Sequence, residues 1–172
     1  GASMGGVYTL ELLKDSRLSF NTIIVDGLSV TKTPEIFKGK LRKTVAGIES
    51  GLIYNLMTKH QELIIKVLGL SSIEELQKMM YTNTSKTTLF NTVYDTIVYD
   101  FDYTRFKNNN VHIWSGSDEK VCIKTAKEIK KVCPSVKVRL FKDCGHGSLL
   151  TQPERLLKAI KKTHYCKKIK EK

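Results

Sequence analysis

The sequence predicts an α/β fold: about three parallel strands with crossover helices, interrupted by a helical insert. Three short apolar runs, within residues 20–30, 111–118 and 136–141, indicate strands that are buried in a sheet. Segments with the 3.6-residue period of an amphipathic helix separate or follow these runs. Strands that alternate with helices form a parallel sheet, because each helix carries the chain back to the start of the next strand.

The first part of the core is assigned to residues 1–30. Residues 5–14 place apolar side chains at helical spacing and predict a helix directly after the first few residues. Residues 23–25, Ile-Ile-Val, form a continuous apolar run that ends at Asp26-Gly27. Such a run, bounded by turn residues, is typical of a strand that is buried on both faces.

The insert, residues 31–107, shows helical periodicity and no strong strand signal. Apolar residues from 48 to 68 predict one long helix, a capping box within 71–75 starts a second helix, and residues 89–97 predict a third. Active sites of parallel sheets lie at the C-terminal ends of the strands, where this insert leaves the core. The insert is therefore interpreted as a cap or lid.

Residues 108–172 complete the predicted core and end in a basic tail. The second strand, within 111–118, is followed by a helix whose apolar positions from 122 to 133 keep a 3.6-residue period, with lysines on the opposite face. The third strand starts after Pro134. A last helix begins near Pro153, because proline is favoured in the first turn of a helix.

The composition, with 41% hydrophobic and 27% charged residues, is that of an ordinary soluble globular protein. A chain of 172 residues can bury its own core, which excludes a disordered tail, a collagen and a mini-protein scaffold. No apolar run approaches the roughly 20 residues that span a bilayer, and no signal peptide is recognisable. We therefore expect a cytoplasmic protein without a membrane span.

The net charge is +12, from 29 Lys and Arg against 17 Asp and Glu. Half of this excess lies in residues 154–172, with eight basic and two acidic side chains. Such a segment suits either contact with nucleic acid or an anionic membrane, or the solvated surface of a lysine-rich protein. No series of aromatic residues alternates with the lysines as base stacking requires, so nucleic-acid binding is not expected.

The four cysteines, Cys122, Cys133, Cys144 and Cys166, form no C-x-x-C pair. Their spacing supports neither a zinc ribbon nor a redox dithiol. Without a secretion signal, an even number of cysteines is weak evidence for disulfides. We expect buried or partly buried free thiols, no metal and no cofactor.

The first six residues, Gly-Ala-Ser-Met-Gly-Gly, match the pattern G-x-S-x-G. Small residues around Ser3 suit a crowded turn from a strand into a helix, which exposes the serine hydroxyl as a nucleophile. The backbone N–H of Met4, at the start of that helix, is then free to bind an oxyanion. In an alternative interpretation, residues 1–3 remain from an expression tag and Met4 is the native start.

Two further segments at strand ends supply a candidate base and a candidate acid. His146 lies between two glycines in the loop after the third strand, where it can take the Ser3 proton and return it to the leaving group. Asp118 or Glu119, after the second strand, can hold the imidazole in its working tautomer. Alternatively, Asp118 or Ser117 caps the helix that follows.

Serine, acid and histidine in this order, each at a strand end, resemble the α/β-hydrolase superfamily. The segment GASMGG resembles its nucleophile elbow, WSGSDEK the loop that carries the acid, and FKDCGHG the loop that carries the histidine. The resemblance covers residues 1–30 and about 108–165, and the insert matches the variable cap of the family in position only. It implies a partial α/β-hydrolase fold.

This resemblance also implies a serine hydrolase that cleaves small-molecule carboxylic esters or related acyl compounds through an acyl-enzyme. By the same resemblance Ser3 is the nucleophile, His146 is the general base and Met4 supplies an oxyanion N–H. The family pattern G-x-x-D places the acid at Glu119, whereas the aspartate itself is Asp118, so both remain candidates. We expect the cap to place apolar side chains over the serine and to favour acyl or aromatic substrates.

One departure from the family is large. About five strands precede the elbow in the family, and none of them is present in this sequence. We therefore expect the C-terminal half of a hydrolase, with low activity on its own and an unpaired strand edge that favours a homodimer or association with the missing N-terminal half. The alternative is a non-catalytic fragment of this fold that binds a partner or its missing half.

Overall fold

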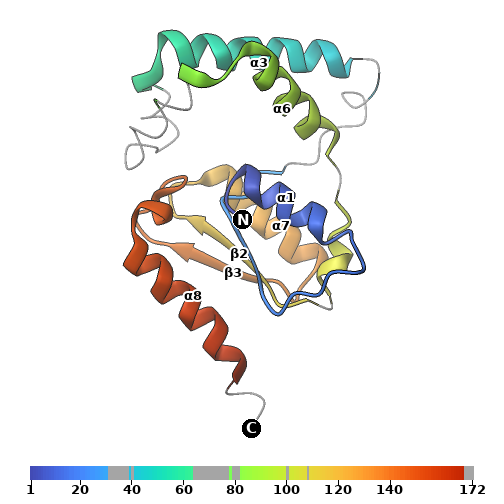
Figure 1. Ribbon diagram of the computed structural model, residues 1–172, viewed down its shortest axis with the longest axis vertical. Helices are drawn as coiled ribbons and strands as arrows, with labels where there is room; N and C mark the ends of the chain where they lie inside the picture. Colours follow the sequence, from blue (N-terminus) through green and yellow to red (C-terminus); the bar gives the residue numbers. More distant parts are fainter. Residues whose placement is uncertain are drawn as a thin grey trace. The chain divides into compact units, whose positions relative to one another are not determined.

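The computed structural model shows two compact units (Figure 1). The first contains residues 1–28 and 103–172, and the second contains residues 29–102. The structure describes residues 1–30, 39, 41–63, 78, 82–99, 101–107 and 109–168, with the backbone alone at 96–98 and 164–168. Among these residues, the strands all belong to the first unit.

Three parallel strands form the sheet of the first unit, in the order β1-β2-β3. They are β1 (Ile23–Asp26), β2 (Val111–Gly116) and β3 (Lys137–Phe141). Val25 of β1 lies opposite Ile113 of β2, which lies opposite Val138 of β3. The predicted α/β fold with about three parallel strands is therefore confirmed. All three carboxyl ends point to the same edge of the sheet, which is where the candidate site lies.

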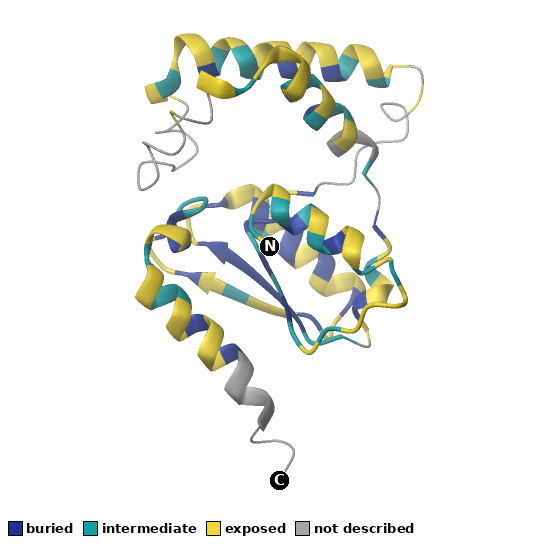
Figure 2. Ribbon diagram, in the orientation of Figure 1, coloured by how far each residue is buried: buried dark blue, intermediate teal, exposed yellow. Residues whose placement is uncertain are grey.

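The helices of the first unit connect and cover these strands. They are α1 (Met4–Leu12), η2 (Tyr103–Phe106), α7 (Lys120–Val132), η3 (Ser148–Thr151) and α8 (Pro153–Lys168), where η denotes a 3-10 helix. α7 is the crossover from β2 to β3, and its buried face includes Ala126 and Ile129. Its lysines lie on the exposed face, as the 3.6-residue period predicts (Figure 2).

The sheet is covered on both faces at its central strand, which explains the continuous apolar run there. The expectation of a buried strand is wrong for most of β3, where Val138 and Leu140 are exposed. All six residues of the central strand β2 are buried. Trp114 packs with Ala159 of α8, whereas a Cβ on Gly6 of α1 would come 2.8 Å from a methyl group of Val25. Because side chains alternate across a sheet, α8 and α1 cover opposite faces.

The backbone at the C-terminal end of β2 lies directly against the backbone of the loop after β3. A Cβ on Gly116 would lie 2.1 Å from the Cys144 carbonyl oxygen, so only glycine fits here. Cys144, Cys122 and Cys133 are buried free thiols, as predicted. The side chain of Cys166 lies outside the described residues.

The second unit contains α3 (Arg42–Lys59) and α6 (Lys86–Val98), which pack against each other. Ala46 and Val93 are buried in this contact. The single helix predicted from residue 48 to residue 68 is wrong, because His60 leaves the helical conformation (φ −137°, ψ 44°) and ends α3.

Two apolar side chains of α3 that contribute to the predicted helical pattern, Ile48 and Leu52, are exposed in the second unit. The predicted capping box near residues 71–75 lies outside the described residues. Among the helices that the structure describes, none is long and apolar enough to cross a membrane.

His112 makes the stability of the first unit dependent on pH. It is buried in β2, and burial, with the nearby positive charges of Lys137 and Arg139, lowers its pKa from 6.5 to about 4. The folded state therefore favours the neutral imidazole. The resulting contribution to stability is complete above pH 6.5 and is lost as the pH falls towards 4.

We expect His112→Gln to lose less free energy of unfolding between pH 7 and pH 4.5 than the wild type, by on the order of 1 kcal/mol. Urea unfolding at the two pH values measures this difference. His60→Gln, which replaces an exposed histidine of the second unit, is the matched control. Equal losses in wild type and His112→Gln would contradict the prediction.

Candidate active site

Ser3 lies in a sharp turn between an extended segment and α1. Ala2 forms a parallel β-bridge with Asp26 of β1, and the Ser3 N–H donates to the Asp26 carbonyl at 2.8 Å. Ser3 has φ 52° and ψ −122°, a strained conformation for a residue with a side chain. Because the helix starts at the next residue, the turn leaves Ser3 exposed. This is the local structure that the G-x-S-x-G pattern predicts.

Residues 1–3 pair with the C-terminal end of β1. The expectation that this strand has an unpaired edge is therefore only partly right. The Asp26 N–H donates to the Gly1 carbonyl at 2.9 Å, and the Asp26 carbonyl accepts from Ser3. The C-terminal end of β1 is therefore paired on one side with residues 1–3 and on the other side with β2. These bonds fix the position of the Ser3 turn relative to the sheet.

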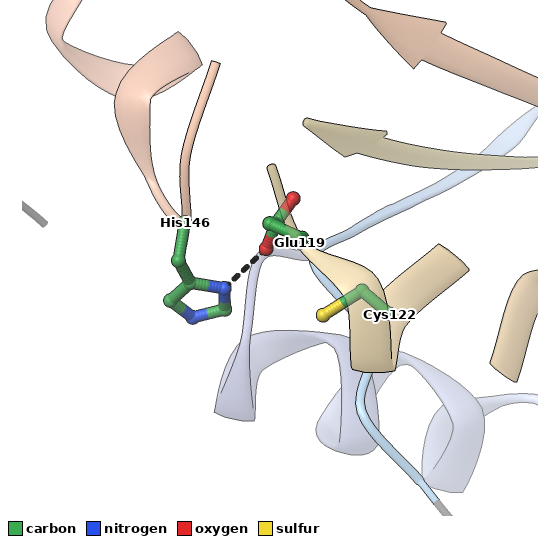
Figure 3. A group of neighbouring side chains, drawn as sticks. All are labelled: Glu119, Cys122 and His146. Carbon is green, nitrogen blue, oxygen red and sulfur yellow. Dashed lines mark hydrogen bonds and ion pairs between the residues drawn. The ribbon is translucent and has the colours of Figure 1, made fainter. Parts of the chain in front are cut away.

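The structure brings together three side chains from distant parts of the sequence. His146 lies in the loop between β3 and η3, followed by Gly147 in the left-handed conformation (φ 72°). The Ser3 hydroxyl lies 2.9 Å from His146 Nε2, and His146 Nδ1 lies 2.5 Å from Glu119 Oε1. Figure 3 shows the imidazole facing the Glu119 carboxylate across this second bond. Ser3, His146 and Glu119 thus form one hydrogen-bonded relay.

Glu119 is buried and held on both carboxylate oxygens. Oε1 accepts from His146, while Oε2 accepts from the Gly116 N–H at 2.5 Å and the Ser115 hydroxyl at 3.1 Å. Its neighbour Asp118 is exposed and accepts a hydrogen bond from Ser117 at 3.0 Å. Of the two predicted acids, the structure therefore places Glu119 on His146 and Asp118 away from it.

The prediction that Asp118 or Ser117 caps the following helix is wrong. Glu119 is the N-cap residue of α7, and no side chain makes a capping hydrogen bond there. The Glu119 carboxylate is turned towards His146 instead. As the N-cap residue, Glu119 still places its negative charge at the positive end of α7, where a negative charge is favoured.

Electrostatics in this cluster stabilise the imidazolium that forms when His146 gains a proton. The pKa of His146 is raised by its hydrogen bond to Glu119 and by the negative charges of Glu119 and Asp26, against the opposing effect of burial. Burial acts to raise the pKa of Glu119, but hydrogen bonds from His146 and Gly116 outweigh it and lower the pKa. Glu119 therefore stays ionised beside the imidazole and stabilises the imidazolium.

The candidate oxyanion donor, the backbone N–H of Met4, lies at the start of α1. Met4 is the first residue of α1, and its N–H donates no hydrogen bond within the described part of the chain. The next two N–H groups, of Gly5 and Gly6, donate at 2.8 Å to the carbonyls of Ala2 and Ser3. A backbone N–H beside Ser3, at the positive end of a helix, suits a developing negative charge.

Three residues of this cluster were not singled out by the sequence patterns. Gly27 follows β1 with φ 61°, and a Cβ on it would lie 2.9 Å from His146 Cε1 and 3.1 Å from Glu119 Oε1. Asp26 has a raised pKa, because it is partly buried and close to the negative charge of Glu119. Burial, with the charge of Glu119 next, raises the pKa of Cys122 to about 12. The available signal in the sequence is the Asp26-Gly27 pair after an apolar run, which by itself predicts only a strand end.

Comparisons with known proteins find similarity in structure alone. No family model matches the sequence, and no curated protein matches it. A search of solved structures matches MenH from S. aureus with a TM-score of 0.69 at 16% identity, over 95% of this chain and 65% of that chain.

Two other solved structures agree with this match. A carboxylesterase structure from Nitrososphaera gargenis has a TM-score of 0.64 at 16% identity, over 93% of this chain and 61% of that one. A protein from Desulfitobacterium hafniense that is assigned to the α/β-hydrolase family has a TM-score of 0.63 at 16% identity, over 94% of this chain and 66% of that chain. The chain thus spans less than two thirds of the length of each. Over the part of these solved structures that it matches, the chain has the α/β-hydrolase fold.

Proposed function

We propose that the chain carries the catalytic relay of a serine hydrolase that cleaves carboxylic esters or related acyl compounds. The observation that carries this proposal is the continuous set of hydrogen bonds from Ser3 Oγ through both nitrogens of His146 to Glu119. This arrangement has the nucleophile, the base and the group that orients the base, each within hydrogen-bond reach of the next.

The chemistry follows from the direction of these bonds. The Ser3 hydroxyl donates to Nε2 while Nδ1–H donates to Glu119, so Nε2 takes the proton as Ser3 Oγ attacks the acyl carbon. The imidazolium, stabilised by Glu119, then protonates the leaving alcohol, and an acyl-enzyme on Ser3 remains. A water molecule loses a proton to Nε2 and attacks the ester, and His146 returns the proton to Ser3 Oγ as the acid leaves.

The Met4 N–H supports this mechanism at the point where charge develops. Each tetrahedral intermediate carries a negative oxygen, and a fixed donor there accelerates such reactions by about 100- to 1,000-fold. The helical residues of the second unit remain our candidate for a cap that selects acyl or aromatic substrates.

Labelling with a serine-directed fluorophosphonate tests the proposal. The wild type should gain one phosphonyl group with loss of fluoride, and peptide mapping should place it on Ser3. Ser3→Ala should remain unlabelled, and Ser85→Ala, which alters an exposed serine of the second unit, should label like the wild type. If wild type and Ser3→Ala label at the same rate, the relay is not a nucleophilic site, and the non-catalytic, partner-binding alternative is favoured.

A further inference from the structure

The sulfur of Cys122 lies beside a carboxylate oxygen of Glu119 and an imidazole nitrogen of His146, and all three are types of atom that bind metal ions. It lies in the first turn of α7, three residues after Glu119, so the two side chains share one side of the helix start. Figure 3 shows the thiol next to the His146–Glu119 pair. A donor atom from each of Glu119, Cys122 and His146 lies within 4.8 Å of the other two.

Sulfur, imidazole nitrogen and carboxylate oxygen together are the donor set that Zn²⁺ and chemically similar ions prefer. Zinc binds sulfur at about 2.3 Å and nitrogen or oxygen at about 2.0 Å, so donors around it lie roughly 3.5 Å apart. Cys122 Sγ would need to approach the other two donors by on the order of 1 Å, whereas Nδ1 and Oε1, now 2.5 Å apart, would need to separate by a similar distance to admit the ion. Rotation of the Cys122 side chain on the helix provides such a movement without moving the backbone.

The surroundings hold the Glu119 carboxylate in place before a metal binds. Gly116 and Ser115 hold Glu119 Oε2, which leaves Oε1 facing His146. The side chains of Cys122 and Glu119 are both buried, so little water competes for these two donors. With three protein donors, a fourth position remains for water or another ligand.

We infer that Glu119, Cys122 and His146 Nδ1 form a binding site for a thiophilic divalent cation of the Zn²⁺ type, and that this cation switches off Ser3. On binding, the Cys122 thiol proton leaves to solvent and the imidazole proton moves from Nδ1 to Nε2. A protonated Nε2 cannot accept the Ser3 proton, so the nucleophile loses its base. The binding part stands alone, whereas the inhibitory part rests on the proposed hydrolase function.

Cadmium is a suitable probe because a cadmium–thiolate bond absorbs in the ultraviolet. We expect the full chain to bind Cd²⁺ with this absorption band. Cys122→Ala and Cys122→Ser should weaken binding by about 10- to 100-fold and lose the band. Cys133→Ala, which removes another buried thiol near the end of α7, should keep both. The two Cys122 variants differ in polarity, so at least one is expected to remain folded, as circular dichroism can verify.

Fluorophosphonate labelling of Ser3 gives a second, independent measurement. Cd²⁺ should slow labelling of the wild type and of Cys133→Ala at least about tenfold, a chelator should restore it, and the folded Cys122 variant should show no slowing at the same concentration. Absence of the thiolate band, or a band that survives loss of Cys122, overturns the metal site. A Cys122-dependent band without any effect on labelling overturns the inhibition. A Cys122-dependent band in a protein whose Ser3 never labels overturns the hydrolase function and leaves the metal site standing.

Discussion

Glu119→Gln is expected to reduce the rate of Ser3 labelling, and any ester turnover, by about 1,000- to 10,000-fold. The amide cannot stabilise the imidazolium that forms when Ser3 loses its proton. It can also present N–H to Nδ1, which then favours the tautomer with a proton on Nε2, where Ser3 needs an acceptor. The Gly116 and Ser115 donors on Oε2 keep the shape of the site similar. Fluorophosphonate labelling rates and aryl-ester hydrolysis, each relative to wild type, measure the loss.

Asp118→Asn is the matched control, because it makes the same chemical change one residue earlier. Its carboxylate is exposed and bonded to Ser117, so its rates should stay within about threefold of wild type. A large loss in Asp118→Asn with little loss in Glu119→Gln would reverse the assignment of the acid.

The second large effect is expected from Gly27→Ala, which adds a single methyl group beside the relay. That methyl group would lie 2.9 Å from His146 Cε1, 3.0 Å from Nδ1 and 3.1 Å from Glu119 Oε1, so the imidazole must shift. A displacement on the order of 1 Å at a reacting group costs about 100-fold in rate. The φ of 61° adds a strain of about 1 kcal/mol or more for any residue with a side chain.

Labelling rate and urea unfolding should be measured together on this variant. We expect the rate to fall by about 100-fold in protein that remains folded, because the clash is with side chains of the relay. Gly47→Ala is the control: no heavy atom lies within 4 Å of its Cβ position in α3, and it should keep the wild-type labelling rate. A Gly27→Ala variant that labels at the wild-type rate would show that His146 adapts and that Gly27 has no positioning role.

Much of the core could be predicted from the sequence because local patterns dictate it. A run such as residues 23–25 can only be satisfied inside a sheet with both faces covered, and β1 occupies that position. The G-x-S-x-G pattern predicted the strained turn at Ser3, because small residues are needed where a chain turns sharply into a helix. In the insert, the same periodicity argument failed at His60, where the backbone leaves the helix although apolar residues continue at helical spacing.

Where adjacent residues of the candidate site point their side chains in different directions, only the tertiary structure shows which of them belongs to the site. Asp118 and Glu119 are adjacent carboxylates, and both follow β2 by the same motif. The loop backbone sends Asp118 to solvent, whereas Gly116 and Ser115 bind the Glu119 carboxylate and direct it to His146. Gly27 joins the cluster only because β1 and the loops after β2 and β3 meet at one edge of the sheet, and Cys122 meets His146 for the same reason. The sequence by itself thus determined the strands, the Ser3 turn and the candidate histidine. The choice of acid and the contacts around it depended on side-chain direction and long-range packing, which spacing along the chain does not encode.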